Sequence, residues 1–406
     1  MTKRYDVAIL GGGLIGSALA VALSRQGLNV ALVDPAAPEE RGADDFDGRA
    51  YAVAPGSRHV LDLLEVWDRI APKAEPIRSI EVVDRAPGPV SPAGLIFDPT
   101  EMAEDALGWI VEDRFLRQAL LEAVSTAKLD HLSPARALAV TRMAGRADVA
   151  LEDGRQLVAS LVVACDGRRS ATARAAGIHY LSWSYGQTGL VSAIAHELPH
   201  EGLAHQSFFP GGPFAVLPLP DNRSALVWSE RDARAKHIRA LDDAAYLAEV
   251  RARIGPRLGA LGQVGKRWAY PLGFQLATSF AVPRLVVAGD AAHGVHPIAG
   301  QGMNLGLRDV AALTETLVEA GRLGLDLGEM TVLERYQRWR RFDATAMALG
   351  MDGLNRLFST GAAPMQALRN LGLAGVGALP EARKFFMQSA SGTGSAAPRM
   401  LHGLAV

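Results

Sequence analysis

Residues 5–34 constrain the fold of this chain more strongly than any other stretch. They read YDVAILGGGLIGSALAVALSRQGLNVALVD, which divides into a short apolar strand, a glycine turn, a helix and a second strand ending at Asp34. Gly11, Gly13 and Gly16 fit G-x-G-x-x-G, in which the first glycine permits a tight turn, the second lets the backbone reach a pyrophosphate, and the third lets helix and strand pack closely. Free N–H groups at the helix start favour phosphate, and the acid closing the second strand can accept hydrogen bonds from an adenosine ribose. This βαβ unit predicts a dinucleotide site, and such units serve both NAD and FAD.

The composition limits the class of protein. A chain of 406 residues exceeds one ordinary core, so we expect about two or three domains. An apolar fraction of 49% with 21% charged residues is typical of a soluble enzyme, and a net charge of -1 provides no long-range field for nucleic acid. Cys165 is the single cysteine, which excludes an intramolecular disulfide and a cysteine-based metal site and is compatible with a reducing compartment. Because no run of about 18 apolar residues occurs, the sequence predicts no transmembrane helix.

Two later segments carry further motifs. Residues 161–177, LVVACDGRRSATARAAG, are an apolar strand that runs into Asp166-Gly167 and then a helix. Residues 289–304, GDAAHGVHPIAGQGMN, follow another apolar strand and precede a helical pattern. Several glycines in the second segment leave room for backbone to lie against a flat ligand. Both segments therefore predict ligand contacts at strand ends.

The loop at residues 289–304 also raises the question of a metal or a catalytic triad. His293, His296 and Asp290 are the available ligands, but they lie on a loop broken by glycine and proline rather than on one helix face. A Ser-His-Asp site would need a G-x-S-x-G elbow between a strand and a helix, and none is found. We predict no metal site and a turn-stabilising role for His296.

The glycine turn, the central Asp-Gly and the later Gly-Asp follow one another as in the flavin-dependent aromatic hydroxylases of the p-hydroxybenzoate hydroxylase fold, which the chain resembles. The likeness narrows to the ubiquinone-biosynthesis hydroxylases of the UbiH type over residues 47–70, 111–124, 208–228 and 351–359. This resemblance implies an α/β fold: a Rossmann-like FAD-binding domain with an inserted β-sheet substrate domain and C-terminal helices. Many members place Glu where this chain has Asp34, and the shorter carboxylate can still bind a ribose.

The resemblance also implies which residues contact the flavin. Asp290 would bind the ribityl hydroxyls, Pro297 would line the face of the isoalloxazine, and N–H groups near Gly302 would point at the flavin N1 and C2 carbonyl, where charge gathers on reduction. The implied FAD contacts are Gly11, Gly13, Ile15, Gly16, Asp34, Arg49, Arg114, Asp166, Gly167, Gly289, Asp290, Pro297, Gly300, Gly302, Met303 and Asn304. Candidates for the active-site lining are Pro297, Gln301, His293 and Phe209. No catalytic residue is assigned.

The flavin motifs lie far apart in sequence, so we expect a discontinuous FAD-binding domain. It is predicted at residues 1–74, 101–177 and 270–345, with the substrate domain at 75–100 and 178–269. Apolar stretches such as LVSAIAHEL, FAVLPLP and SALVWSE predict strands in the substrate domain. A substrate pocket is expected at the domain boundary. The aromatic candidates for its lining, some of them ordinary core, are Phe208, Phe209, Phe214 and Trp228.

The C-terminal part differs in charge from the rest. Residues 335–406 contain nine Lys or Arg and three Asp or Glu, a local excess of six positive charges. We expect a helical region at 346–390 and a flexible tail at 391–406. Basic amphipathic helices either contact an anionic membrane surface or pack on the FAD-binding domain, and the sequence leaves both open.

By resemblance, the activity is that of a class A flavin monooxygenase. In such enzymes NAD(P)H or another electron donor reduces FAD, and for this chain the donor would be NAD(P)H or a partner protein. O2 then forms a hydroperoxide at flavin C4a, and one oxygen atom is transferred to an aromatic ring. The implied substrate is a polyprenylated phenol of ubiquinone biosynthesis, within a biosynthetic complex in the cytoplasm or peripheral on the inner face of a membrane. Two alternatives stay open: a same-fold hydroxylase or epoxidase of another aromatic or alkene, and a non-catalytic flavin-fold subunit.

Overall fold

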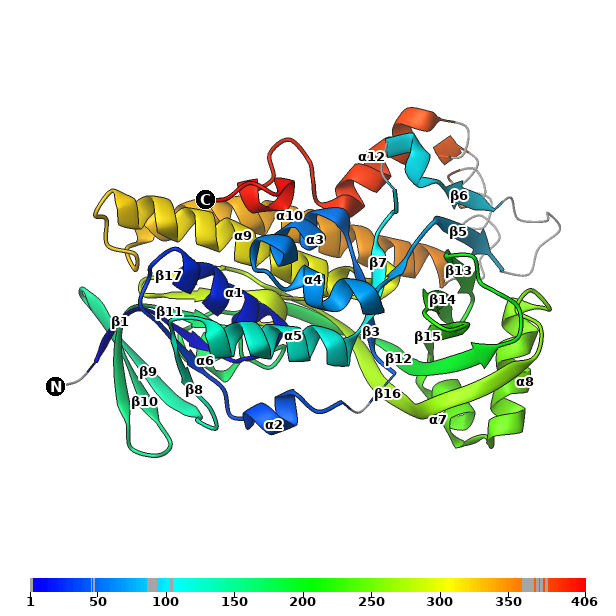
Figure 1. Ribbon diagram of the computed structural model, residues 1–406, viewed down its shortest axis with the longest axis horizontal. Helices are drawn as coiled ribbons and strands as arrows, with labels where there is room; N and C mark the ends of the chain where they lie inside the picture. The colour runs from blue at the N-terminus through cyan, green and yellow to red at the C-terminus, as the bar shows by residue number, and fades with distance from the viewer. Residues whose placement is uncertain are drawn as a thin grey trace.

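The computed structural model describes residues 3–44, 46, 48–85, 94–102, 105–359, 369, 372, 375–376 and 379–406. Within them, two large sheets and the helices around them form a mixed α/β protein (Figure 1). The predicted fold class is confirmed.

The first sheet contains the predicted βαβ unit. Its order is β17-β18-β11-β1-β2-β8, and β9 and β10 extend from β11 as antiparallel neighbours. The strands are β1 (Arg4–Leu10), β2 (Val30–Val33), β8 (Asp130–Leu132), β9 (Ala137–Met143), β10 (Arg146–Leu151), β11 (Gln156–Ala164), β17 (Ala281–Val282) and β18 (Leu285–Val287). Neighbours from β18 to β8 are parallel, and β2 and β18 are buried throughout, as expected for a parallel sheet covered on both faces.

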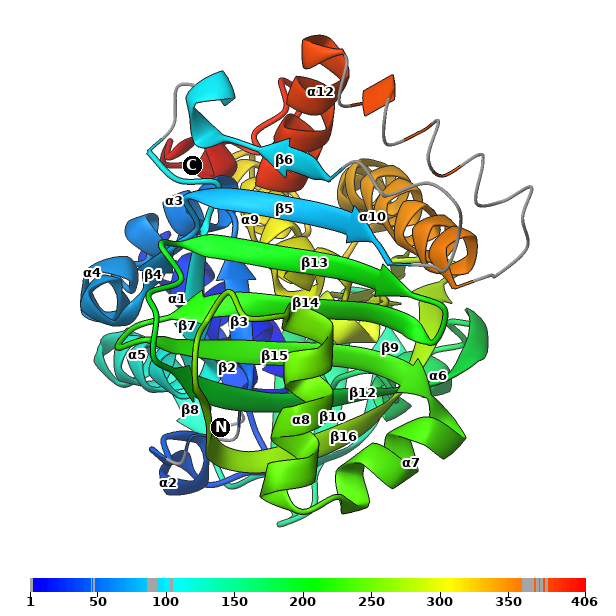
Figure 2. The same cartoon turned by 90° about the vertical axis from the view of Figure 1, so that its right-hand side faces the viewer.

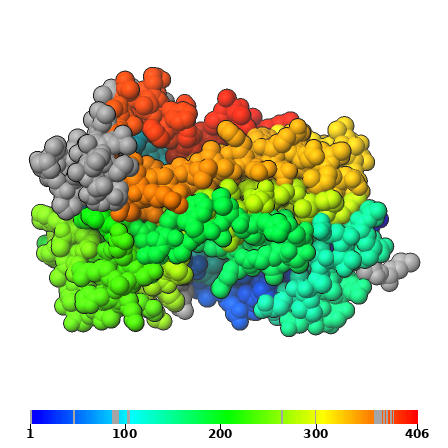
Figure 3. Space-filling model, turned by 180° about the vertical axis from the view of Figure 1, so that it is seen from behind, coloured from blue at the N-terminus to red at the C-terminus, as the bar shows by residue number. Residues whose placement is uncertain are grey.

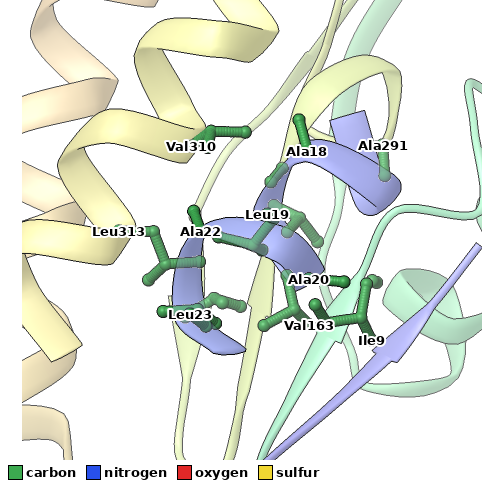
Figure 4. Packing of buried hydrophobic residues seen from close by; sticks show 14 of the residues in the cluster. Ile9, Ala18, Leu19, Ala20, Ala22, Leu23, Val163, Ala291, Val310 and Leu313 are labelled. Carbon is green, nitrogen blue, oxygen red and sulfur yellow. The ribbon is translucent and has the colours of Figure 1, made fainter. Parts of the chain in front are cut away.

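Helix α1 (Leu14–Arg25) packs between the first sheet and α9 (Gln301–Arg322), as Figure 4 shows. On one side, Ala22 faces Leu313 of α9. On the other, Ala20 lies near Ile9 and Val163 of the sheet. Small alanines let both neighbours approach the helix closely, so the turn that precedes α1 is held by a dense core.

The second sheet has the order β19-β16-β12-β15-β14-β13-β5-β6. Its strands are β5 (Ser79–Asp84), β6 (Leu95–Phe97), β12 (Tyr180–His196), β13 (Leu203–Phe209), β14 (Gly212–Leu219), β15 (Arg223–Arg231), β16 (Leu261–Ala277) and β19 (His293–Gly294). Helices α7 (Asp232–Ala240) and α8 (Asp243–Ile254) cover its outer face, where Phe214, Trp228 and Tyr246 form part of one buried cluster (Figure 2). The other face is turned toward the first sheet and its helices.

A small third sheet and short helices lie between the two large sheets and around them. The strands are β3 (Ala50–Val53), β4 (Glu75–Pro76) and β7 (Trp109–Glu112), in the order β3-β7-β4. The helices are α2 (Pro38–Arg41), α3 (Pro55–Leu63), α4 (Trp67–Ile70), α5 (Asp113–Thr126) and α6 (Ala171–Ala175), with 3-10 turns η1 (Ala71–Lys73), η2 (Pro99–Met102), η3 (Gly289–Ala291) and η4 (Ile298–Gly300).

One predicted domain boundary needs correction. The division between residues 269 and 270 falls inside β16, which runs unbroken to Ala277. The end of β16 also pairs with β19, where Gln275 lies opposite Gly294. The composition does not change along this long strand, so the sequence did not reveal that β16 extends across the predicted boundary. The remaining domain boundaries stay predictions.

The C-terminal helices are α10 (Met330–Phe358) and α12 (Pro380–Ser391), with a 3-10 turn η5 (Arg399–His402). Of the helical region predicted at 346–390, positions 360–368, 370–371, 373–374 and 377–378 lie outside the described residues. In the described ranges, no helix combines the length and hydropathy needed to cross a bilayer.

The tail predicted to be flexible is packed instead. The Leu401 side chain is buried, and its carbonyl accepts a hydrogen bond from His59 Nδ1 at 2.9 Å. Ala396 O accepts from Trp339 Nε1 at 2.8 Å, and Arg399 N donates to Glu315 Oε2 at 2.9 Å. Its Gly- and Ser-rich composition suggested flexibility, but its partners come from α3, α9 and α10, which local composition does not report.

Candidate functional site

The turn between β1 and α1 brings backbone against backbone. Gly11 has a φ of +112°, and a Cβ there would lie 2.3 Å from the carbonyl oxygen of Cys165. A Cβ at Gly16 would lie 1.8 Å from the carbonyl oxygen of Gly11. Gly13 differs, because no atom of the described residues lies within 4 Å of the position its Cβ would take. Protein packing requires Gly11 and Gly16, whereas the open space over Gly13 suits an external ligand.

The start of α1 offers hydrogen-bond donors to that space. Gly13 is the N-cap, and no side chain caps the helix. Uncapped N–H groups and the positive end of the helix dipole favour an anion such as a pyrophosphate. Gly12 is needed too, because a Cβ there would lie 2.3 Å from Asp34 Oδ2. The sequence pattern did not single out Gly12, since its requirement comes from the neighbouring strand.

Asp34 follows β2 and is buried beside the glycine turn. Its Oδ2 accepts from Arg41 Nε at 3.0 Å and its Oδ1 from Arg41 Nη2 at 2.9 Å. Oδ1 also accepts from the backbone N–H of Ala36 at 2.8 Å. A ribose bound here would therefore share the carboxylate with Arg41. No motif marks Arg41, so the sequence pattern does not predict its contact with Asp34.

The two predicted flavin-contacting arginines sit on either side of one acidic pair. Arg49 Nη2 lies 3.0 Å from Asp113 Oδ2, and Arg114 Nε donates to Glu112 Oε2 at 2.8 Å. Tyr51 lies nearby on β3, and burial followed by the charge of Asp113 raises the pKa of its hydroxyl. Both arginines are thus held in place by ion pairs at the third sheet.

The central Asp-Gly lies at the carboxyl end of β11. Asp166 Oδ2 accepts from the backbone N–H of Thr172 at 3.2 Å, at the start of α6. Gly167 has a φ of +85° with open space around it. The next residue, Arg168, reaches across to the later loop, where its Nη2 donates to Val295 O at 3.4 Å. A Cβ at Gly294 would lie 2.6 Å from Arg168 Nε, so this glycine makes room for the arginine.

The loop after β18 begins directly against α1. Gly289 has a φ of +62°, and its Cβ position would lie 3.1 Å from Ile15 Cγ1. Ile15 also packs on Gly306 of α9, so its side chain joins the glycine turn to the loop. Asp290 is exposed at the end of this strand. An ionised carboxylate is a pure acceptor, which suits hydroxyl groups of a ligand.

The two histidines of the loop point into the protein. His293 Nε2 donates to Asp309 Oδ2 at 2.7 Å with both side chains fully buried, so the structure does not place His293 in an active-site lining. The predicted lining role for His293 is therefore wrong. Its partner Asp309 lies on α9, so the local sequence pattern around His293 could not reveal this contact. His296 is buried beside Tyr185, with ring centroids 5.2 Å apart.

Helix α9 starts within this loop and is left uncapped. Gly300, its N-cap, has a φ of +62°, and no side chain caps the first N–H groups. Near Gly302 the described residues leave the Cβ position open. The Asn304 side chain points elsewhere: its Oδ1 accepts from Ala54 N at 3.1 Å and its Nδ2 donates to Ala52 O at 2.9 Å. Asn304 thus clamps the third sheet, and only its backbone faces the helix start.

The remaining predicted loop residues line the same helix start. Pro297 precedes η4, and the Gln301 and Met303 side chains are largely buried around the first turn of α9. Gln301 Oε1 accepts from Asn304 Nδ2 at 3.5 Å. Pro297 and Gln301 remain candidates for the active-site lining.

Phe209 lies on the wrong face of its strand for the predicted lining role. Its ring packs with Phe214 at a centroid distance of 6.4 Å, in the cluster under α7 and α8. Successive side chains of a strand alternate between faces, so Phe208 points the other way. It clusters with Ile298 and Phe358, beside the loop after Pro297. The strand was predicted from sequence, but which of two adjacent phenylalanines faces inward was not.

These features fit a flavin dinucleotide. The open glycine turn and uncapped α1 suit the pyrophosphate, Asp34 suits a ribose, and the exposed Asp290 with the uncapped α9 suits the flavin end. Among the described residues, no group of three or more His, Cys, Asp or Glu side chains could hold a metal ion.

A protein-family model described as "FAD binding domain" matches residues 4–348. The chain belongs to this family. It is an FAD-dependent monooxygenase of the group that includes the ubiquinone-biosynthesis hydroxylases, which confirms the resemblance seen in the sequence.

Curated relatives of this flavoprotein match over nearly their whole length. A ubiquinone hydroxylase, UbiL, of Rhodospirillum rubrum is 42% identical and covers 99% of this chain and 94% of the relative. A 3-demethoxyubiquinol 3-hydroxylase of Escherichia coli is 35% identical, and the match covers 91% of this chain and 93% of the relative. The human mitochondrial ubiquinone biosynthesis monooxygenase COQ6 is 31% identical over 95% of this chain and 92% of its own.

Solved structures share the fold of this monooxygenase. The p-nitrophenol 4-monooxygenase PnpA of Pseudomonas putida superposes with a TM-score of 0.77 at 18% identity, covering 97% of this chain and all of that one (100%). PqsL of P. aeruginosa, in complex with 2-aminobenzoylacetate, gives a TM-score of 0.75 at 24% identity, covering 92% and 100%. At these identities the likeness concerns the fold.

Proposed function

We propose that this FAD-dependent monooxygenase hydroxylates the aromatic ring of a polyprenylated phenol in ubiquinone biosynthesis. The observation that carries the proposal is the 42% identity, over 99% of the chain, to a relative named as a ubiquinone hydroxylase. Individual residues are assigned roles in this proposed reaction.

A cluster of buried apolar side chains, here called the apolar wall, lies beside the loop at residues 289–304, here called the flavin loop, and supports a lipid-like aromatic substrate. Ile298 directly follows Pro297 and clusters with Phe208 of β13 and Phe358 of α10. The two phenylalanine rings stack with centroids 4.1 Å apart. A ring with an isoprenoid tail gains about 25 cal/mol for each Å² of apolar area it buries on such a wall.

FAD, when bound, supplies the redox chemistry: it accepts electrons and activates dioxygen for transfer of one oxygen atom to the ring. The chain holds and tunes it. Asp290 would accept hydrogen bonds from the ribityl hydroxyls, and the uncapped N–H groups of α9 would stabilise negative charge on the reduced ring by about 0.3–2 kcal/mol. Pro297 would support the ring face, and the apolar wall would exclude water. NAD(P)H or a partner protein would provide the electrons.

Genetic complementation tests the substrate assignment. Strains blocked separately at each ring hydroxylation of ubiquinone synthesis would express the chain, and quinone intermediates would be measured by mass spectrometry. Rescue of at least one strain is expected. Gly13→Ala, designed to exclude the cofactor, serves as the matched inactive control. Rescue of none, with FAD-loaded protein present, would overturn the ubiquinone assignment in favour of another aromatic or alkene substrate. An Asp290→Ala variant that binds no flavin yet complements fully would favour a non-catalytic subunit.

Peripheral membrane contact through the C-terminal helices is part of the proposal. The inner side of α10 packs on α9, but Phe342 on its outer side is 81% exposed, with exposed Arg338 and Arg341 beside it in sequence. Seen from behind, α10 lies at the surface along much of its length (Figure 3). On α12, Phe385 is 65% exposed and follows Lys384. Apolar side chains flanked by cations suit an anionic bilayer, where a basic residue contributes about 1 kcal/mol.

Co-sedimentation with vesicles tests this contact. The protein should bind vesicles containing phosphatidylglycerol more than pure phosphatidylcholine vesicles, and Phe342→Ser with Phe385→Ser should weaken that binding. Leu138→Ser, which removes an exposed apolar residue of β9, is the matched control. Equal binding by the double variant and the wild type would contradict membrane contact through this surface and leave a biosynthetic complex as the partner to test.

A further inference from the structure

A buried histidine next to the flavin loop has no hydrogen-bond partner in the described part of the chain. His296 immediately precedes Pro297, and its side chain is 1% exposed. Neither Nδ1 nor Nε2 meets a donor or acceptor among the described residues. An unsatisfied buried polar atom costs about 1–3 kcal/mol, so such groups in native proteins usually serve a purpose or bind a water.

Tyr185 supplies a second orphaned polar group at the same place. Its ring meets His296 edge to face, with centroids 5.2 Å apart and an interplanar angle of 70°. Its hydroxyl is buried and makes no well-formed hydrogen bond within the described residues, although the nearby Asp352 carboxylate adds to burial in raising its pKa. Tyr185 sits where the pairing of β12 with β16 shifts between Ser184 and Gln187, next to Gly186 with a φ of +61°. This irregularity turns Tyr185 toward the flavin loop.

Asp352 connects this pair to the surface. It lies on α10, is 7% exposed, and its charge acts on both His296 and Tyr185. One carboxylate oxygen accepts from Trp183 Nε1 at 3.1 Å, and the other pairs with Arg356 Nε at 2.8 Å. Arg356 is largely exposed. A line of polar groups therefore runs from the residue before Pro297 to solvent.

The charge state of His296 suits a relay. Burial, reinforced by Arg168 and opposed by Asp352, lowers its pKa to about 4, so the imidazole is neutral at neutral pH. A neutral imidazole accepts a proton on one nitrogen and releases one from the other. One water between the imidazole and the Tyr185 hydroxyl would satisfy these orphaned atoms and meet the two to four polar partners that a buried water needs.

We propose that His296, Tyr185 and Asp352 form a proton-entry chain, bridged by one water, that delivers the proton consumed in each turnover. The inference rests on the monooxygenase activity. In the balanced reaction, NAD(P)H, dioxygen, the phenol and one proton give NAD(P)+, water and the hydroxylated ring, so a proton must reach the closed site from solvent.

The transfer regenerates Asp352, Tyr185 and the water, whereas His296 ends in its other neutral tautomer and must return to the first before the next turnover. Asp352 takes a proton from bulk water and passes it to the Tyr185 oxygen, while Tyr185 gives its own proton to the bridging water. The water protonates one nitrogen of His296, and the imidazole releases the proton on its other nitrogen toward the site. His296, Tyr185 and Asp352 are positioning residues, because they pass a proton along the relay and do not contact the substrate.

Nitrogen NMR of the flavin-bound full-length protein tests the geometry without any turnover. The ring signals of His296, assigned by their loss in His296→Gln, should shift in Tyr185→Phe, which removes one oxygen atom only. Tyr180→Phe is the matched control, since Tyr180 lies on the same strand but donates to Ala291 O at 2.8 Å. Unchanged His296 signals in Tyr185→Phe would overturn the link.

Proton uptake tests the function without the phenol. Anionic reduced flavin, one dioxygen and one proton give oxidised flavin and hydrogen peroxide, and a pH indicator in weak buffer follows the proton. Tyr185→Phe and His296→Gln should each slow proton uptake by about a hundredfold or more, the scale of a positioned proton-transfer group. The double variant should be no slower than the slower single variant. Uptake in Tyr185→Phe that keeps pace with wild type would overturn the proposal. The proton relay and the substrate assignment can fail separately. If the variants take up protons slowly but the wild type hydroxylates no prenylated phenol, the relay is supported and only the substrate assignment is rejected.

Discussion

Asp309 of α9 holds His293 from behind the flavin loop, with Oδ2 2.7 Å from His293 Nε2 and both side chains inaccessible to solvent. Its other oxygen accepts from Arg340 Nε at 2.7 Å, and Gly289 N donates to Oδ2 at 2.8 Å. One carboxylate thus ties the start of the loop to two helices.

Replacing Asp309 by Asn should destabilise the protein strongly. The change removes one of the two carboxylates paired with the buried guanidinium of Arg340 and leaves only Asp343, and breaking a buried pair costs about 3–5 kcal/mol. Urea unfolding of the variant and wild type measures the difference. Asp153→Asn removes an exposed partner of Arg155, where solvent screens the pair, and should change stability far less. Equal losses in the two variants would contradict a special role for Asp309.

Stability should fall as the pH drops from about 6.5 to 4 because of His296. Burial lowers its folded-state pKa to about 4, whereas the unfolded chain has the ordinary value of 6.5. A lowered folded pKa means that the stabilising contribution is complete above pH 6.5 and is lost as the pH falls toward 4, by on the order of 3 kcal/mol. His296→Gln should flatten this part of the curve, measured by urea unfolding at several pH values. His237→Gln, at an exposed site on α7, is the control and should keep the wild-type slope.

Gly13→Ala and Gly16→Ala should separate cofactor binding from folding. Open space surrounds the Gly13 Cβ position, so the alanine variant should fold as stably as the wild type but exclude the pyrophosphate and lose FAD. At Gly16 the added carbon would lie 1.8 Å from Gly11 O, so stability should fall as well. Flavin fluorescence titration and unfolding of the apoprotein measure both effects. A Gly13→Ala protein that keeps wild-type FAD affinity would refute the assigned phosphate site.

Phe208→Leu and Phe209→Leu should differ although the residues are adjacent. Phe208 faces Ile298 and Phe358, so its variant should bind the phenol more weakly and release more hydrogen peroxide per NAD(P)H consumed. Phe209 packs under α7 and α8, so its variant should lose stability, by about 1 kcal/mol, with substrate binding unchanged. Binding titration, peroxide yield and unfolding distinguish the two. A Phe209 variant with the larger binding defect would reverse the assignment of faces.

The local part of the fold was predictable from sequence. The strand, turn and helix from Arg4 to Arg25, and the start of α9 at Gln301, follow from apolar periodicity and glycine spacing within short windows. Resemblance to the hydroxylases added the cofactor.

The long-range part was not predictable from one sequence. The ion pair between Asp34 and Arg41 carries no motif, and the partner of His293 lies on a different helix. Which face of the second sheet Phe209 lies on depends on the register of β13. Two adjacent phenylalanines do not reveal that register in the sequence. The composition of the C-terminal tail predicts flexibility, whereas long-range contacts such as that of Arg399 with Glu315 determine its structure.

The interleaving of the two large sheets determines the order in which the protein can fold during synthesis. β1 and β11 of the first sheet leave the ribosome early, but their neighbour β18 is residues 285–287, after the whole of β16. Domains usually fold as units from the N-terminal end as the chain emerges. Here the first sheet would wait, with the apolar edge of β11 uncovered, until strands β12 to β16 of the second sheet have been made. Nascent chains halted before residue 285 should therefore depend on chaperones, and neither large sheet can be cut out as one continuous segment.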